Sequence, residues 1–197
     1  MFKSSIFSGI VIGIGCIAYC NATNNVIGAL LFSFALLSIC TFKSNLFTGK
    51  CGLLYKWRIK VKQLLCILLG NVFGVASVAL LYYVNLSDSI VQLSLDKASM
   101  RLHTAFIESV LCGVLMNNAV RVMQNICIAS VSICMLCVMA FLLSGFEHCI
   151  ANIYYLTIAA LQGYDICSII IVLCTCILGN LLGAVVHEYL FTYKIST

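Results

Sequence analysis

The sequence predicts an all-α membrane protein with six transmembrane helices in two inverted three-helix repeats. Of its 197 residues 63% are hydrophobic and only 9% are charged, and the mean hydropathy is +1.13. Soluble domains carry about 25% charged residues. This composition therefore excludes a soluble globular enzyme. It also excludes a disordered chain, because disorder requires low hydrophobicity.

The six spans follow from apolar segments of sufficient length. A bilayer core takes about 20 apolar residues per helix. The segments, in order, are 6–20, 26–42, 64–84, 102–120, 126–143 and 166–190. A signal peptide at the N-terminus is disfavoured, because its apolar run carries the helix-packing pattern Gly9-x-x-x-Gly13.

The second and fifth helices are predicted to be broken. Two further apolar stretches, 47–55 and 149–161, are too short to cross a bilayer alone. Each follows a span after a polar or Gly-containing break, at 43–49 and 144–148. Interrupted helices are tolerated in a membrane only where they line a cavity or are buried in protein.

Charge placement orients the spans. If six spans alternate, these basic residues share one side: Lys3, Lys50, Lys56, Arg58, Lys60, Lys62, Arg121 and Lys194. The other side carries Asp88, Asp96 and Asp165, with Lys97 and Arg101. The positive-inside rule then places both termini in the cytoplasm of a multi-pass plasma-membrane protein. Topology explains the net charge of +5, so we expect lipid and no nucleic acid as a partner.

An internal repeat is visible in matching positions. Gly13 and Gly113 are 100 residues apart, as are Thr48 and His148 at the two breaks. The pattern G-N-x-x-G occurs at 70–74 and again at 179–183. Three spans per half is an odd number, so the second half must run in the opposite direction. The sequence thus predicts one domain, 1–197, with repeats 1–85 and 97–192, and a pathway near the bilayer midplane.

The chemistry of a metal site or an enzyme is not visible. Most of the 13 cysteines lie in apolar runs, where they act as small hydrophobic side chains. Only Cys134 and Cys137 form a C-x-x-C pair, so no zinc spacing recurs. No Ser/His/Asp constellation, acid pair or cofactor fingerprint is present. We therefore expect no metal, no cofactor and no enzymatic activity.

Polar residues at the second break are the candidate functional groups. His148 is an ionisable residue within a span and is functional by default, although a neutral His satisfied by a carbonyl or hydroxyl is the alternative. The Thr48 hydroxyl could fix its tautomer. Glu147 and Asn152 are expected to accept hydrogen bonds from backbone N–H groups that the break exposes. Lys97 either attracts anions at the outer end of a span or snorkels to the interface.

Several motifs resemble the formate/nitrite transporter family. Residues 32–33 (F-S) and 46–49 (L-F-T-G) resemble its second span and the following loop. Residues 145–152 (G-F-E-H-C-I-A-N) resemble the G-F-E-H-x-x-A-N signature of its broken fifth helix. Residues 111–115 (L-C-G-V-L) are similar to L-C-N-W-L in the fourth span, and 179–183 matches the sixth. The resemblance covers nearly the whole chain.

The resemblance implies a homopentamer of aquaporin-like protomers, each with a pore for formate, nitrite or hydrosulfide, or the neutral acid. It assigns the outer constriction to Phe32 and Phe141, the inner one to Leu36, Leu46 and Phe47, the loop threonine to Thr48, the central histidine to His148 and the vestibule lysine to Lys97. Gly113 stands where the family usually has asparagine, which resembles the hydrosulfide-channel branch.

The expected function is proton-linked passage of such anions. As the dielectric falls, an anion's proton affinity rises, and only its neutral acid crosses apolar constrictions cheaply. The proton would come from bulk water or be shared with His148. The alternatives are a pore for a neutral solute such as water or urea, and a membrane enzyme.

Overall fold

The computed structural model describes residues 1–195, with side chains through Thr192. These residues form helices and no strands, which confirms the all-α class. The helices are α1 (Phe2–Cys20), α2 (Asn25–Thr41), α3 (Phe47–Cys51), the 3-10 helix η1 (Gly52–Trp57), α4 (Val61–Tyr82), the 3-10 helix η2 (Tyr83–Asn85), α5 (Asp88–Ala98), α6 (Leu102–Val122), α7 (Ile128–Leu143), α8 (Cys149–Leu161) and α9 (Ile166–Ile195). The side chain of Lys194, expected on the cytoplasmic side, lies outside the described residues.

Each of the six expected spans corresponds to one helix. By length and composition, α1, α4, α6 and α9 can cross a membrane. Helices α2 and α7 have 17 and 16 residues and rise only about 24–26 Å, which is less than a bilayer core of about 30 Å. Each is followed, after a non-helical break, by a short helix, α3 or α8. The described chain therefore contains more helices than the six expected spans.

Helix α5 is one that hydropathy does not predict. Its buried residues Ile90, Ser94 and Ala98 are spaced four apart, so they form one stripe along the helix. The helix packs against α8. Its remaining residues are mostly polar, and the segment therefore lacks the continuous apolar run that reveals a span.

The long helices pack in two closely matched pairs, α1 with α4 and α6 with α9. A Cβ atom at Gly9 would lie 2.4 Å from the carbonyl oxygen of Asn71. A Cβ atom at Gly113 would lie 2.3 Å from the carbonyl oxygen of Asn180. Only glycine permits this backbone-to-backbone approach, as in small-residue packing of membrane helices. Gly113 is therefore required for helix packing.

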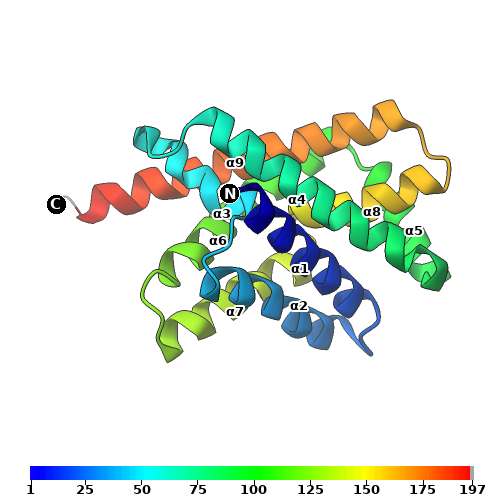
Figure 1. The fold of residues 1–197 in the computed structure, drawn as a ribbon, viewed down its shortest axis with the longest axis horizontal. Coiled ribbons are helices and arrows are strands. Elements are labelled where there is room, and N and C mark those ends of the chain that lie inside the picture. Colours follow the sequence, from blue (N-terminus) through cyan, green and yellow to red (C-terminus); the bar gives the residue numbers. More distant parts are fainter. Residues whose placement is uncertain (196–197) are drawn as a thin grey trace.

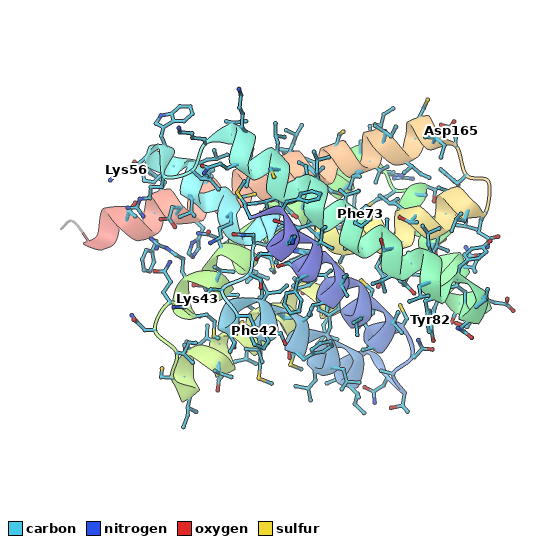
Figure 2. All side chains as sticks on the ribbon, viewed as in Figure 1. Phe42, Lys43, Lys56, Phe73, Tyr82 and Asp165 are labelled. Carbon is cyan, nitrogen blue, oxygen red and sulfur yellow. The ribbon has the colours of Figure 1, made fainter. Side chains whose placement is uncertain are left out.

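Charged side chains gather at the two ends of the elongated molecule. Figure 1 shows α5 and the end of α8 at one end, and the C-terminal part of α9 at the other. Asp165 caps α9, and the Ser168 backbone N–H that donates to Asp165 Oδ2 at 2.7 Å lowers the pKa of this exposed carboxyl. Lys43 and Lys56 lie at the end opposite Asp165 (Figure 2).

A buried ion cluster fixes the basic end. Glu188 of α9 accepts from Arg121 Nη2 at 2.6 Å and from Arg58 Nη1 at 3.4 Å. Asn117 Nδ2 donates to the same carboxylate at 3.3 Å. The cluster joins α9 to α6 and to the residue that follows η1. Between the two ends, large apolar side chains such as Leu69 and Phe73 are exposed on α4, as expected for a surface that contacts lipid (Figure 2).

Candidate functional site

The two breaks share one backbone geometry. Lys43 after α2 and Gly145 after α7 have φ values of 52° and 74°, in the left-handed region. In both breaks the next residue donates its N–H to the carbonyl five positions earlier, at 2.9 Å. This arrangement ends a helix and commonly uses glycine. At the first break a lysine adopts it, at a steric cost of about 1–2 kcal/mol.

Asn180 of α9 organises the second break. Its Oδ1 accepts from the N–H of Cys149, the first residue of α8, at 2.9 Å. Its Nδ2 donates to the carbonyl oxygens of Glu147 at 2.8 Å and Ser109 at 2.7 Å. One side chain therefore satisfies two backbone groups of the break, the Cys149 N–H and the Glu147 carbonyl, and also ties the break to the Ser109 carbonyl within α6.

Asn71 of α4 repeats this arrangement at the first break. Its Oδ1 accepts from the N–H of Phe47, the first residue of α3, at 2.8 Å. Its Nδ2 donates to the carbonyl oxygens of Asn45 at 3.0 Å and Ser5 at 2.7 Å. Both asparagines are fully buried. Both asparagines belong to the recurring G-N-x-x-G pattern, which is the feature of the sequence that could have identified them as residues that hold the breaks.

These contacts correct the expected role of Glu147 and Asn152. Neither carboxylate oxygen of Glu147 accepts a backbone N–H in the described hydrogen bonds. Its Oε1 pairs with Lys97 Nζ, and its Oε2 accepts from Asn152 Nδ2 at 2.6 Å. The backbone groups of the break are taken by Asn180, because its amide offers both a donor and an acceptor, whereas an ionised carboxylate only accepts.

The contacts also correct the register of the proposed repeat. Gly9, not Gly13, makes the contact with α4 that Gly113 makes with α9. Leu46 precedes α3 as His148 precedes α8, so Leu46, not Thr48, occupies the position of His148. These matching positions are therefore not separated by a uniform 100 residues.

His148 is held at both ring nitrogens. Its Nδ1 accepts from the N–H of Ala151 at 3.1 Å and so caps α8. Its Nε2 lies 2.9 Å from Thr48 Oγ1 on α3. Because Nδ1 accepts, a neutral ring carries its proton on Nε2 and donates it to Thr48. The ring is 2% exposed and Thr48 is 1% exposed, so both are shielded from bulk solvent.

Apolar side chains surround this pair. The rings of Phe32 and Phe141 meet edge to face with centroids 5.9 Å apart, and Phe141 lies 5.6 Å from the His148 ring. All five residues expected in the two constrictions are buried in the same core: Phe32, Leu36, Leu46, Phe47 and Phe141. The Phe32 and Phe141 rings are therefore in contact beside His148, and the other three side chains are buried elsewhere in the same core.

The structure contains two cavities with different linings. The first, here named the His148 cavity, has a volume of about 160 Å³ and is lined by His148, Phe141, Lys97 and Asn152, among others. The second, named the Leu46 cavity, has a volume of about 430 Å³ and is lined by Leu46, Lys43, Lys50, Val120 and Ile126, among others.

The cavities lie at opposite ends of α7. Ile126, just before this helix, lines the Leu46 cavity, whereas Phe141, near its last residue, lines the His148 cavity. The rise of the 16-residue helix separates them by about 24 Å. Phe32 and Leu36 line neither cavity and are buried in the core. The described residues thus contain two separate cavities and a buried apolar core.

Lys97 reaches the His148 cavity from α5. Its ammonium pairs with Glu147, and its side chain is 18% exposed. Lys97 thus lines the same cavity as His148, but it lies on a separate helix and has a carboxylate as its partner. The pair carries no net charge, so it does not make this cavity as positive as a free lysine would.

Comparisons with known proteins agree on one family. A family model described as "Formate/nitrite transporter" matches residues 1–194. The formate channel FocB of Escherichia coli (strain K12) is 27% identical over 186 aligned positions, which cover 81% of this chain and 66% of FocB. The chain thus spans about two thirds of the length of this relative.

Solved structures give the same result for the fold. A chain described as "FNT family ion channel" matches with a TM-score of 0.83 and 27% identity, covering 100% of this chain and 89% of the other. A chain described as "Pentameric formate channel with formate bound" matches with a TM-score of 0.81 and 22% identity, covering 99% and 96%. The described helices therefore have the fold of such channels.

Proposed function

Because the chain belongs to the formate/nitrite transporter family, we propose that it is a membrane channel for small monovalent anions or their neutral acids. The matched family and its structural relatives are channels and transporters, not enzymes. The observation that carries the proposal is the pair of cavities at opposite ends of α7, separated by buried apolar residues and the His148–Thr48 pair.

The apolar barrier selects for a neutral permeant. Phe32, Leu36 and Phe141 offer no hydrogen bond to an anion, and an unpaired charge in such surroundings costs many kcal/mol. Desolvation raises the proton affinity of a weak-acid anion. We infer that formate, nitrite or hydrosulfide combines with a proton at the barrier, crosses as the acid and loses the proton on the other side.

The proton comes from bulk water in this proposal. A neutral His148 that gave up its Nε2 proton would become an imidazolate, an anion in an apolar site. A doubly protonated ring would direct an Nδ1–H at the Ala151 N–H that now caps onto it. His148 therefore acts as a hydrogen-bond donor from Nε2, shared between Thr48 and the passing solute.

Lys97 provides the polar entrance of the His148 cavity. The Lys97 ammonium has three N–H donors, and one of them pairs with Glu147 Oε1. The remaining N–H groups can bind an arriving anion while the Glu147 pairing keeps the ammonium in place. Attraction by Lys97 is thus local and short in range, since at a distance the Glu147 charge cancels it.

The helix directions support two inverted repeats, 1–85 and 97–192. Tyr19, near the end of α1, lines the His148 cavity, whereas Val120, near the end of α6, lines the Leu46 cavity. Equivalent helices therefore end at opposite cavities. With the basic residues at the Leu46 end, we propose a plasma-membrane protein with cytoplasmic termini, an external His148 cavity and, as in the pentameric relative, a homopentameric assembly.

The test is uptake of formate, nitrite and hydrosulfide into proteoliposomes at two external pH values. We expect uptake of at least one of them above that of protein-free liposomes, with a rate that increases as external pH falls. Water and urea uptake serve as the comparison. Uptake of only these neutral solutes, independent of pH, would contradict the proposal and favour a neutral-solute pore.

A further inference from the structure

The connection from η1 to α4 has an unusual sequence pattern. Residues 55–62 read Y-K-W-R-I-K-V-K, so that aromatic or aliphatic residues alternate with basic ones over eight positions. The segment covers the end of η1, which follows α3 and its Thr48, and the first residues of spanning helix α4. It lies at the basic end of the molecule, near Lys56 in Figure 2.

Trp57 projects from this connection. It is 82% exposed, although it is the only tryptophan in the chain. Lys56 and Trp57 have consecutive positive φ values of 60° and 53°, a left-handed conformation that is costly for residues other than glycine. Nothing among the described side chains covers the indole. Tryptophan is favoured at the headgroup level of a bilayer, so this position would account for the exposed ring.

The lysines of the connection lack counterions within the described chain. Lys56, Lys60 and Lys62 are all exposed, and none forms an ion pair there. The sequence has only six acidic residues: Asp88, Asp96, Glu108, Glu147, Asp165 and Glu188. Glu188 is taken by Arg58 and Arg121, and Glu147 by Lys97. Asp165 lies at the opposite end (Figure 2).

We propose that residues 55–62 form a binding site for the headgroup of an anionic phospholipid. The ammonium groups of Lys56, Lys60 and Lys62 contact the phosphate, and Trp57 inserts at the boundary of headgroup and acyl chains. Basic residues beside a membrane span attract anionic lipid, whereas the exposed Trp57 favours a bilayer over a soluble polyanion.

The site is attached to the pore elements at both sides. Arg58 joins the connection to Glu188 of α9, and η1 joins it to α3, whose Thr48 contacts His148. A bound lipid would therefore restrain the connection that follows α3 and η1. The lipid site does not depend on what the pore conducts, so loss of transport in an assay leaves it testable.

The single tryptophan provides a direct test with the full-length protein in vesicles. Trp57 fluorescence is recorded in phosphatidylcholine vesicles that contain brominated phosphatidylglycerol or, in parallel, the same amount of brominated phosphatidylcholine. One lysine near an anionic surface contributes about a fivefold preference. We expect stronger quenching by the anionic lipid, and a preference that decreases as salt is raised.

Charge variants separate the site from general effects. Lys56→Gln, Lys60→Gln and Lys62→Gln together should reduce the quenching ratio to near one, whereas Lys56→Arg, Lys60→Arg and Lys62→Arg together should keep it. Arg101→Gln, an exposed cation at the other end, serves as the control and should leave the ratio unchanged. Equal quenching by both lipids in the parent protein would overturn the site. A Trp57 signal that no lipid quenches, but that added heparin shifts, would overturn it in favour of a soluble polyanion.

Discussion

His148 Nε2 and Thr48 Oγ1 lie 2.9 Å apart, although the two residues are separated by 100 positions in the sequence. The same imidazole accepts from the N–H of Ala151 through Nδ1, at 3.1 Å. His148 therefore has two separable tasks. It caps helix α8 with one nitrogen and donates toward α3 with the other.

Substitution of His148 by Asn should separate these tasks. An asparagine oxygen caps helices well, so His148→Asn should keep the start of α8, whereas His148→Leu should lose about 1 kcal/mol of capping. We expect His148→Asn to unfold in detergent near the temperature of the parent, but with a reduced anion flux and an altered pH profile in proteoliposomes. Parent-like stability and flux in His148→Leu would contradict both assigned tasks.

For both stability and anion flux, we expect the hydroxyl of Thr48 to matter more than the shape of its side chain. Thr48→Val has nearly the same volume but leaves the Nε2–H of His148 without its acceptor, at a cost of about 1–3 kcal/mol. Thr48→Ser retains the acceptor. We expect Val to lower the thermal midpoint and the anion flux, and Ser to restore most of both. Equal fluxes in the Val and Ser variants would show that the contact has no part in permeation.

The sequence indicates the span helices well because their signal is local. Apolar runs of span length are visible without knowledge of neighbours, and each of the six coincides with a helix. Helix α5 was not predicted, because its buried stripe is short and its other residues are mostly polar. The pairing of Lys97 with Glu147 depends on where α5 packs, so it could not be predicted from the sequence either.

The polar core of the breaks required three-dimensional information. Asn71 and Asn180 are visible as a repeated motif, but the backbone groups they bind lie on other helices. Periodicity carries no information about such partners. The assignment of Phe32 and Phe141 to a constriction came from the resemblance, since apolar residues in spans usually serve packing.

Loss of either asparagine should destabilise the protein. Asn180→Leu and Asn71→Leu each remove the side-chain partner of two backbone groups at a break, and each group left unpaired costs about 1–3 kcal/mol. We expect large decreases in the thermal midpoint of both variants, or failure to fold. Asn118→Leu is the matched control, because among the described residues the Asn118 side chain donates only to the Cys137 thiol, at 3.4 Å. A comparable decrease in this control would contradict a special role for the two break residues.

The Glu188 cluster should respond asymmetrically to charge removal. Glu188→Gln leaves the guanidinium of Arg121, which is 13% exposed, without a full counter-charge, and breaking such a buried pair costs about 3–5 kcal/mol. Arg58 is 44% exposed, so Arg58→Gln should cost at most about 1 kcal/mol. Thermal unfolding of both variants in detergent measures the difference. Equal midpoints for Glu188→Gln and the parent would contradict the stabilising role of the cluster.

Two exposed cysteines can establish the orientation of the protein. Cys127 follows α6 and lies beside Ile126, which lines the Leu46 cavity, whereas Cys167 lies beside Asp165 at the start of α9. The proposed topology places Cys127 inside the cell and Cys167 outside. In intact cells, a membrane-impermeant maleimide should label Cys167 and spare Cys127, and after permeabilisation it should label both.

Mass spectrometry of the labelled peptides assigns each site, and Cys127→Ser and Cys167→Ser serve as controls for the assignment. Cys174 is also exposed, but it lies within α9, where lipid would shield it from a water-soluble reagent. Labelling of Cys127 alone in intact cells would reverse the orientation. Labelling of both at once would contradict the arrangement in which the two cavities open on opposite sides of the membrane.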